Sequence, residues 1–459
     1  MSKGGSGMKG FDYCESAVEH ALRRGAASAE AFFLKSRKLE AMIEKNDIHV
    51  PKGDTYSGIG LRVLVEAEGG FKQGFAATNL LESESIDSTI SAAMAIAAAS
   101  PADPARCIGD APDESVSIVP VERIYDESIA QMGLDGALRN ASALLDGTLS
   151  YDYRVTMDSA SFSAQTGEKF ILNSNGVRLH QRKTVASTMA MAFAVDGERV
   201  SSFDVEVAES CLLDDLDFFA AGRRLGERVV HSLDARPVPS FRGKLLITPY
   251  SAIDLVLEIL ECSCNADMVQ SGRSKWKGML GKQVLSPMMS LVDDPRIPGG
   301  SGSTTFDREG VISERVDLIV DGVLNDYLYN CYSASHDGRK SNGRASGGDS
   351  SLPGVSATNL IVQPGQLNFA QLLAACDRGL MVNRFSGNVD TSSGDFSGIV
   401  KGGYYIENGE MVHPIKEVMI AGNMYELLGQ VVGLSDELNI VGNMRVPHIL
   451  VDGCSITGK

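Results

Sequence analysis

Residues 154–210 carry the strand-like pattern that constrains the fold of this chain most strongly. Apolar and polar side chains alternate along this stretch, and turn dipeptides interrupt it at Thr166-Gly167, Asn175-Gly176 and Asp196-Gly197. Strands that are joined by turns of this kind pair antiparallel. The stretch therefore predicts an antiparallel sheet near the middle of the chain.

The residues before this stretch predict further strands between two helices. Apolar residues recur at helical spacing in residues 12–24 and 86–99, and prolines follow the second segment. Between them, residues 29–50 alternate as a strand, and residues 57–78 predict two strands joined at Gly69-Gly70. Helical periodicity then returns over residues 121–149, before the central strands.

The length of 459 residues suggests two or three domains at roughly 150 residues each. A polar, proline-rich stretch at residues 101–115 predicts a linker, and Pro237 and Pro239 end a helix expected over residues 214–233. The predicted fold class is α+β, with helix and antiparallel-sheet lobes followed by a β-rich C-terminal domain. The expected divisions are an N-terminal α/β lobe at residues 1–104, a middle α+β region at 118–236 and the C-terminal domain at 241–459.

Strands and turns also dominate the last part of the sequence. Residues 292–330 alternate and turn at Asp321-Gly322, whereas the small, polar residues 338–354 predict a mobile surface loop. A helix is expected over residues 371–378. The glycines around Gly299, Gly347 and Gly402 lack the lysine and hydroxyl pattern of a P-loop, so we expect them to supply positive φ at turns.

The charge balance bears on the class of partner. The chain has 42 Lys and Arg against 59 Asp and Glu, a net charge of −17, which argues against a surface that binds nucleic acid. No run resembles a signal peptide or reaches the roughly 18 apolar residues of a membrane span, so a cytoplasmic protein without membrane association is expected. The eight cysteines are scattered, which predicts free and mostly buried thiols.

The stretch Ser251–Ser274 is where a helix carries carboxylates and thiols into a turn. These groups resemble metal ligands, yet no histidine lies between His231 and His336. Neither an H-x-x-x-H pair nor a G-x-S-x-G elbow is present, and the C-x-C at Cys262 and Cys264 lacks the spacing of a structural zinc site. Packing thiols and solvated acids are the simpler interpretation. The candidate ligands are Glu258, Glu261, Cys262, Cys264, Asp267 and, beside a glycine-rich segment, His336.

The whole chain resembles the TldD/PmbA family. NSNGV and LLITPYSA are similar to the family's middle part and to the entry of its last domain. NADMVQSGRSKWKGMLGKQV, VDDPRIPGGSGS and SGDFSGIVKGGYYIENGE with VMIAGN resemble its C-terminal domain closely. The opening segments ALRRGAASAEAFF and SGIGLRVLVEAEGGFKQGFAAT are similar to its first lobe.

The resemblance assigns a metal motif to this chain in altered form. In TldD-like metallopeptidases, an H-E-x-x-x-H motif precedes an Ala-Asp pair, which Ala266-Asp267 resembles. Laid on this sequence, the motif falls on residues 257–262, which include Leu257, Glu258, Glu261 and Cys262. Both histidines of the motif are replaced, and its glutamate is kept as Glu258. The family's cysteine ligand near the C-terminus falls in NIVGNMRVPH, where the position is deleted, and Cys454 lies beyond it. This pattern resembles the PmbA branch, also called TldE.

The resemblance implies a non-catalytic subunit that binds no zinc itself and pairs with a TldD-like catalytic subunit, the pair cutting extended, unfolded peptides. Catalytic zinc needs about three protein ligands and an open position, and Leu257 supplies none. Two alternatives stay open. One is a metallopeptidase with a relocated site around Glu258, Glu261, Cys262 and His336. The other is a homodimeric peptide-binding protein.

Overall fold

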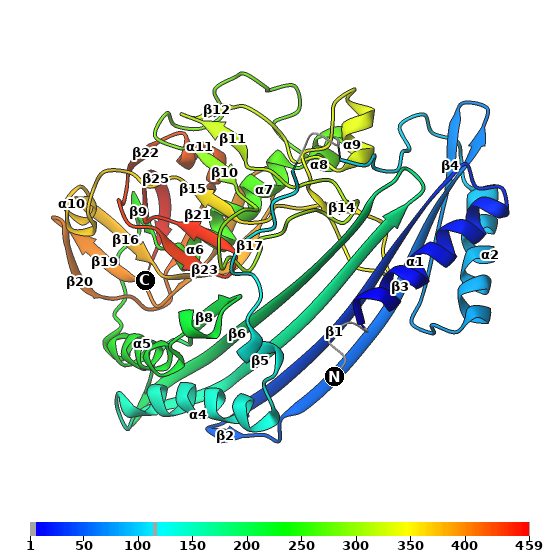
Figure 1. Cartoon of the computed structure of the whole chain (residues 1–459). Coiled ribbons are helices and arrows are strands. Elements are labelled where there is room, and N and C mark those ends of the chain that lie inside the picture. Colours follow the sequence, from blue (N-terminus) through cyan, green and yellow to red (C-terminus); the bar gives the residue numbers. More distant parts are fainter. Residues whose placement is uncertain (1–5, 113–116, 459) are drawn as a thin grey trace.

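The computed structural model describes residues 6–112 and 117–458. Residues 113–115 of the expected linker lie outside the described residues, as do the first five residues of the expected N-terminal lobe and Lys459 of the C-terminal domain. The described chain combines helices with four sheets, so the predicted α+β class is confirmed. Its strand-rich C-terminal part follows two long-stranded N-terminal segments, as expected (Figure 1).

One eight-stranded sheet joins the strands of both N-terminal segments in the order β4-β3-β1-β5-β6-β7. Strand β1 pairs antiparallel with β3 on one side and with β5 on the other, from Glu30 opposite Asn173 to Glu44 opposite Ser159. The N-terminal lobe and the middle region therefore share a sheet, which runs diagonally across Figure 1. Its strands are β1 (Ser28–Glu44), β2 (Asp47–Ile48), β3 (Lys52–Ala67), β4 (Gly70–Thr78), β5 (Val155–Asn173), β6 (Arg178–Asp196), β7 (Arg199–Val200) and β8 (Asp204–Ser210).

The turn predicted at Thr166-Gly167 is wrong. Strand β5 runs through it, and Gly167 pairs with Ser36 of β1 and with Lys183 of β6. A strand between two long partners gains hydrogen bonds along both sides, which outweighs the weak preference of glycine for a turn. The turns predicted at Gly69, Gly176 and Gly197 are confirmed, and all three glycines have positive φ.

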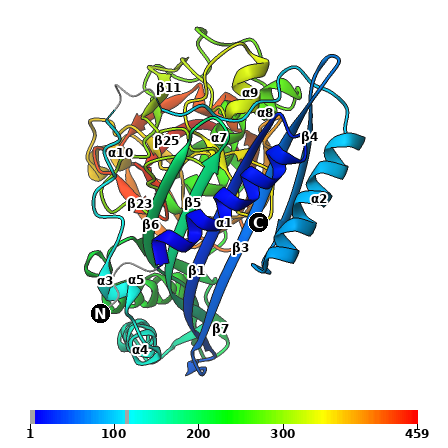
Figure 2. The ribbon, with the colours of Figure 1, turned by 45° about the vertical axis from the view of Figure 1, so that its right-hand side comes forward.

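Two pairs of helices cover the same face of this sheet at opposite ends. Along β1, alternate residues from Ala29 to Phe33 pack in the cluster under α1 and α2, whereas those from Leu39 to Ile43 pack in the cluster under α4 and α5. Figures 1 and 2 show both pairs on this face. The helix expected over residues 121–149 is divided into two, because the helical conformation is interrupted before Gly133, the N-cap of the second helix. The helices are α1 (Ser6–Arg23), α2 (Ser83–Ala99), α3 (Glu127–Ala130), α4 (Leu134–Ser150) and α5 (Phe218–His231), with 3-10 turns at Leu213–Asp215 and Ser232–Asp234.

The other face of the sheet packs against the C-terminal domain. Phe32 and Ile171, which are cross-strand partners, form a buried cluster with Phe306 of that domain. Gly58 and Gly60 of β3 approach Asp349 so closely that a Cβ at either position would overlap its atoms. The contact between the sheet and the C-terminal domain is therefore close-packed.

The C-terminal domain is built around a nine-stranded sheet, with a six-stranded sheet and a two-stranded ribbon beside it. Strands β9 and β25 pair at the centre of the larger sheet. The larger sheet comprises β9 (Phe241–Ile247), β16 (Arg378–Val382), β17 (Arg384–Val389), β18 (Asp395–Lys401), β19 (Tyr404–Glu407), β20 (Glu410–Pro414), β21 (Met419–Asn423), β22 (Val431–Leu434) and β25 (Ile449–Thr457). The others comprise β10 (Leu291–Asp293), β11 (Val316–Val320), β12 (Val323–Leu324), β15 (Leu360–Val362), β23 (Asn439–Val441) and β24 (Met444–Val446), and β13 (Ala345–Ser346) with β14 (Gly354–Val355).

Two expectations for this domain need correction. The segment at residues 338–354 is not a free surface loop, because Arg344 is 1% exposed and Asp349 is 3% exposed. Arg344 forms a buried ion pair with Asp293, and Asp349 accepts a hydrogen bond from the Tyr56 hydroxyl, whereas residues 338–340 and 350–352 are exposed as expected. The helix expected over residues 371–378 ends at Ala374, because Arg378 already belongs to β16. The remaining helices are α6 (Pro249–Ala252), α7 (Glu258–Cys264), α8 (Ala266–Gln270), α9 (Cys331–His336), α10 (Phe369–Ala374) and α11 (Met424–Leu428).

Candidate functional site

The stretch that carries the motif positions is helical, as predicted. Strand β9 leads into α6, whose first turn is closed by a capping box between Thr248 and Ser251. A π-helical turn at Ile253–Leu257 connects α6 to α7, and Asn265 then caps α8 by accepting from the amides that follow it. Single π turns of this kind occur often at functional sites. The local structure therefore presents the motif positions on a capped helical segment.

Leu257 lies in the hydrophobic core. Its side chain is 0% exposed and belongs to the largest buried cluster of the C-terminal domain, together with Leu255, Val256 and Leu260. Glu258, the next residue, is exposed to solvent. Two neighbouring motif positions thus point into different environments, one apolar and one aqueous.

Glu261 and Cys262 lie at the border of this core. The Glu261 carboxylate accepts hydrogen bonds from the Ser356 hydroxyl at 2.9 Å and from the Ala357 amide at 2.8 Å. Glu261 thereby ties α7 to the segment that follows β14. Burial raises the pKa of the Cys262 thiol, although the nearby Thr391 side chain opposes the shift. A raised pKa disfavours the thiolate, which is the form that binds metal.

His336 lies on a different helix from the other candidate ligands. It ends α9, its side chain is exposed, and its Nδ1 lies 3.2 Å from the carboxylate of Asp337. Among residues 6–112 and 117–458, no three His, Cys, Asp or Glu side chains gather in a group that could hold a metal ion. The described structure therefore does not assemble the relocated set of Glu258, Glu261, Cys262 and His336, and the donors present do not fit a catalytic zinc.

The region of the deleted cysteine ligand forms a hairpin of β23 and β24. Cys454 lies in the final strand β25, as the resemblance implies, and its side chain is 0% exposed. Its thiol lies 3.5 Å from the Ala421 carbonyl of the neighbouring strand. All eight cysteines are free and six are buried, which confirms the predicted state of the thiols. Cys454 therefore packs within the sheet.

A chain of buried ion pairs links the N-terminal sheet to the C-terminal domain. Arg62 donates to Glu30 at 2.7 Å and forms an ion pair with Glu309 at 2.7 Å, and Arg308 lies 3.0 Å from the other oxygen of Glu30. None of these four side chains is more than 3% exposed. Buried charges of this kind are retained only when each has a partner. This network was not predicted from the sequence, although single charges within apolar strands, such as Arg62 in GLRVLV, were a usable signal.

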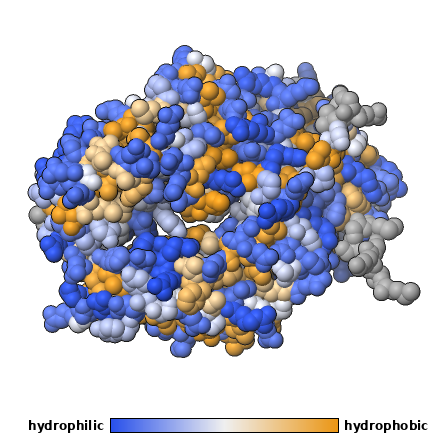
Figure 3. Space-filling model, turned by 60° about the vertical axis from the view of Figure 1, so that its left-hand side comes forward, coloured by the Kyte–Doolittle hydropathy of each residue, from blue (hydrophilic) through white to orange (hydrophobic). Residues whose placement is uncertain are grey.

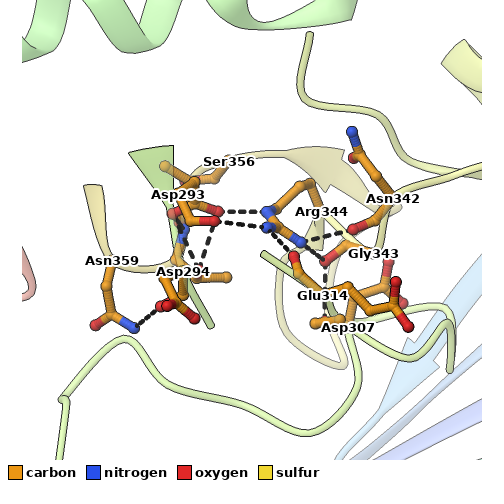
Figure 4. Close-up of polar contacts among 12 residues, drawn as sticks. Asp293, Asp294, Asp307, Glu314, Asn342, Gly343, Arg344, Ser356 and Asn359 are labelled. Carbon is orange, nitrogen blue, oxygen red and sulfur yellow. Dashed lines mark hydrogen bonds and ion pairs between the residues drawn. The ribbon is translucent and has the colours of Figure 1, made fainter. Parts of the chain in front are cut away.

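A second buried pair, Arg344 with Asp293, holds the segment after α9 against the six-stranded sheet. Figure 4 shows the Arg344 guanidinium between Asp293 and the backbone carbonyls of residues 342, 343 and 314. The Asp293 carboxylate also accepts from the amide of Thr358 at 2.8 Å. Asp307, nearby in Figure 4, accepts from the Ala345 amide, and burial together with Glu309 raises its pKa to about 7.

Two cavities lie on the face of the sheet that meets the C-terminal domain. The larger, of about 690 Å³, is lined by Met42, Met189 and Met191 at the end of the sheet away from the ion-pair chain. The smaller, of about 280 Å³, lies between the sheet and the segments that hold Arg308 and Arg344. Figure 3 shows the molecule hollowed between its upper and lower parts, with apolar side chains gathered on the walls of the hollow.

Comparisons with known proteins agree over most of the chain. Sequence models of three PmbA/TldA metallopeptidase units match it: domain 1 at residues 29–97, the central domain at 122–233 and the C-terminal domain at 241–458. The Metalloprotease PmbA homolog of Haemophilus influenzae is 26% identical over 450 residues, 96% of this chain and 95% of that protein. The Metalloprotease TldD homolog of the same organism is 26% identical over 62% of this chain and 61% of its own length.

Among solved structures, TldE from Thermococcus kodakarensis superposes with a TM-score of 0.84 at 20% identity, over 97% of this chain and all of that one. The fold and the motif helix thus define a metallopeptidase-like protein. The chain belongs to the TldD/PmbA family, whose sequence models match most of its length. In the described residues, no helix is both long and apolar enough to cross a membrane.

Proposed function

We propose that this chain is a PmbA/TldE-type subunit without a catalytic zinc of its own, and that it pairs in the cytoplasm with a TldD-type catalytic subunit to cut unfolded peptides. One observation carries the proposal. Leu257, which stands where the family's first zinc-binding imidazole is expected, is 0% exposed in the hydrophobic core. An aliphatic side chain donates no electron pair, so the ligand set is incomplete.

The neighbouring residues do not compensate for this loss. The Cys262 thiol has a raised pKa, which weakens it as a ligand. Glu258 is exposed, and a glutamate acts as general base in such sites only beside a metal-polarised water. Zinc chemistry is accordingly assigned to the partner, and this chain is assigned a structural and peptide-binding role.

The comparisons and the surface support the assignment of partner and ligand. One organism, Haemophilus influenzae, has both a PmbA homolog and a TldD homolog that resemble this chain. The methionine-lined pocket offers apolar, adaptable side chains, with Met42 51% and Met189 57% exposed. Flexible methionines suit ligands of varied sequence, such as unfolded peptides.

Mixing this chain with a TldD-type chain that retains the H-E-x-x-x-H motif tests the proposal. We expect cleavage of an unfolded peptide by the mixture at a rate at least about tenfold above the sum of the separate chains, because the site would be completed by assembly. Native mass spectrometry should show a one-to-one complex, with zinc in the TldD-type chain alone.

The matched control replaces the zinc-binding histidines of the partner with alanine, which should abolish cleavage while the complex still forms. Peptidase activity with stoichiometric zinc in this chain alone would contradict the proposal and favour a relocated metal site. A stable homodimer that binds peptide and ignores the partner would favour the homodimeric peptide-binding alternative.

A further inference from the structure

The smaller cavity, of about 280 Å³, is lined by residues from both halves of the molecule. Lys169 of β5 and Lys183 of β6 come from the sheet, on the face that meets the C-terminal domain. Residues 304, 306–308, 343–347 and 356–358 come from the C-terminal domain. The cavity therefore lies beside the ion-pair chain and the Arg344–Asp293 pair, and next to the segment that Glu261 holds.

The two lysines donate their hydrogen bonds to neutral oxygen atoms, and Lys169 Nζ also lies over the Phe306 ring, 4.3 Å from its centre. Lys169 Nζ donates to the Thr304 hydroxyl at 2.7 Å and to the Phe306 carbonyl at 2.6 Å. Lys183 Nζ donates to the Ser303 carbonyl at 3.0 Å and to that of Ser301. Neither ammonium forms an ion pair with a carboxylate in the described part of the chain. Each ammonium carries three N–H groups and uses two of them in these hydrogen bonds, which leaves one hydrogen-bond donor beyond them.

The other charged groups of the cavity already have partners. Arg308 is paired with Glu30, and Arg344 with Asp293. Asp307 accepts from three backbone amides, those of residues 309, 311 and 345. The lysines therefore supply positive charge that no neighbouring side chain neutralises by direct contact.

This surplus charge affects the titration of Lys169. Burial, with repulsion from Lys183 and Arg308 against the weaker attraction of Asp307, lowers the pKa of Lys169 to about 7. Burial also lowers the pKa of Lys183. Desolvated ammonium groups without a counter-ion are unfavourable, and a bound anion would relieve both shifts.

The size and the lining of the cavity limit which molecule could carry the anionic group. Gly167 lies opposite Lys183 across the β5–β6 pair, and a Cβ built on it would meet nothing within 4 Å. Leu34 and Ala357 add apolar wall. The volume lies just below the roughly 300–1,000 Å³ of sites for drug-sized ligands. A ligand of one or two amino-acid residues fits this size.

We propose that this pocket binds the carboxylate of a small ligand that also carries an apolar group, held by the Nζ atoms of Lys169 and Lys183. The free C-terminus of a peptide with an apolar last residue has this chemistry, and so does a free acylated amino acid. Choosing the peptide end as the natural ligand rests on the proposed function, whereas the carboxylate site itself does not. Ammonium–carboxylate hydrogen bonds in a partly buried site are strong and selective.

Calorimetry on the purified chain alone tests the site with N-acetyl-leucine against N-acetyl-leucinamide. We expect the acid to bind at least about tenfold more tightly than the amide, because only the acid supplies the missing charge. A short peptide ending in leucine, compared with its C-terminal amide, separates the two sources: tighter binding of the peptide than of N-acetyl-leucine identifies the peptide end. Equal affinity for acid and amide, or no binding of either, would overturn the proposal.

Two variants locate the binding. Gly167→Leu should fill the cavity and reduce acid binding by about tenfold or more while both lysines remain, since the new side chain takes the open space. Lys169→Met should do the same through loss of charge. Lys72→Met, at a partly exposed lysine bonded to the Ala98 carbonyl, is the control and should bind as the unaltered chain does. Melting curves verify folding, and unchanged binding by folded Gly167→Leu would overturn the proposal.

The affinity for the acid should also depend on pH. The ligand binds the protonated form of Lys169, whose pKa is about 7 in the free chain, so binding is full below that pH and weakens as pH rises above it. The groups that face this amine are Lys183, Asp307 and Arg308. Calorimetry at about pH 6 and pH 9 measures the difference, and Lys169→Met should reduce it, with the remainder coming from Asp307 and Lys183. Because these measurements use one chain and no protease assay, their failure is distinct from failure of the partner proposal.

Discussion

Replacing Arg62 with methionine should lower the free energy of unfolding by about 3–5 kcal/mol, because a buried ion pair that loses one partner leaves an uncompensated charge. Arg62 contacts both Glu30 and Glu309 at 2.7 Å, and both carboxylates are essentially inaccessible to water. The variant would leave Glu30 with Arg308 alone, and Glu309 with no cationic partner in the described residues. The loss should therefore loosen the contact between the sheet and the C-terminal domain.

Urea unfolding measures this effect, followed by circular dichroism and by the fluorescence of Trp276, the single tryptophan, which lies in the C-terminal domain. Arg315→Met is the matched control, because Arg315 pairs with Asp317 at the surface, where both side chains are about half exposed. Exposed pairs contribute only about 0–1 kcal/mol. Equal loss of stability in the two variants would show that the buried chain does not hold the two parts together.

Leu257→His should be the most damaging single change in the motif helix. It removes a fully buried leucine, for which truncation alone costs about 2–5 kcal/mol, and it places a polar imidazole in the same apolar space. Burial lowers the pKa of such a histidine below its ordinary value of about 6.5. The penalty should therefore grow as pH falls below about 6.5, where the unfolded chain binds the proton and the folded chain does not.

Cys262→His is the control for this prediction, because Cys262 is only half-buried and should tolerate the ring with a smaller loss. Thermal melting of both variants and of the double variant, with and without zinc, makes the comparison. We expect no rise in melting temperature with zinc, since the donor set stays incomplete. A clear rise for the double variant alone would show that these two positions can form a metal site.

Local patterns predicted the helices and the tight turns of this chain well. Gly176 and Gly197 follow strands with clear alternation, and their turns are present because a positive φ favours glycine there. Thr166-Gly167 looked similar, yet β5 continues because β1 and β6 pair with it on both sides. Long-range pairing of this kind leaves no mark within the turn dipeptide itself. Part of the segment at 338–354 differs from the prediction for a related reason, since Arg344 and Asp349 bond within the interior.

For the candidate site, spacing and resemblance identified the motif helix, and the structure adds the environment of each side chain. Burial of Leu257 and the bond between Glu261 and Ala357 depend on the packing of distant segments. Lys169 and Lys183 were not predicted as site residues, because an isolated lysine on a strand is normally a solvent-facing residue. The charge of the two lysines is unusual only because residues 304–308 of the C-terminal domain lie over their face of the sheet.

The long pairing of β1 with β5 has a consequence for synthesis of the chain. As the polypeptide emerges from the ribosome, β1 can pair with β3 at once, but its second edge stays open until residues 155–173 have been made. An open edge of this length is a template for pairing with other chains. Until β5 closes it, the nascent protein is most exposed to aggregation, and a chaperone that covers strand edges would act most usefully in this interval.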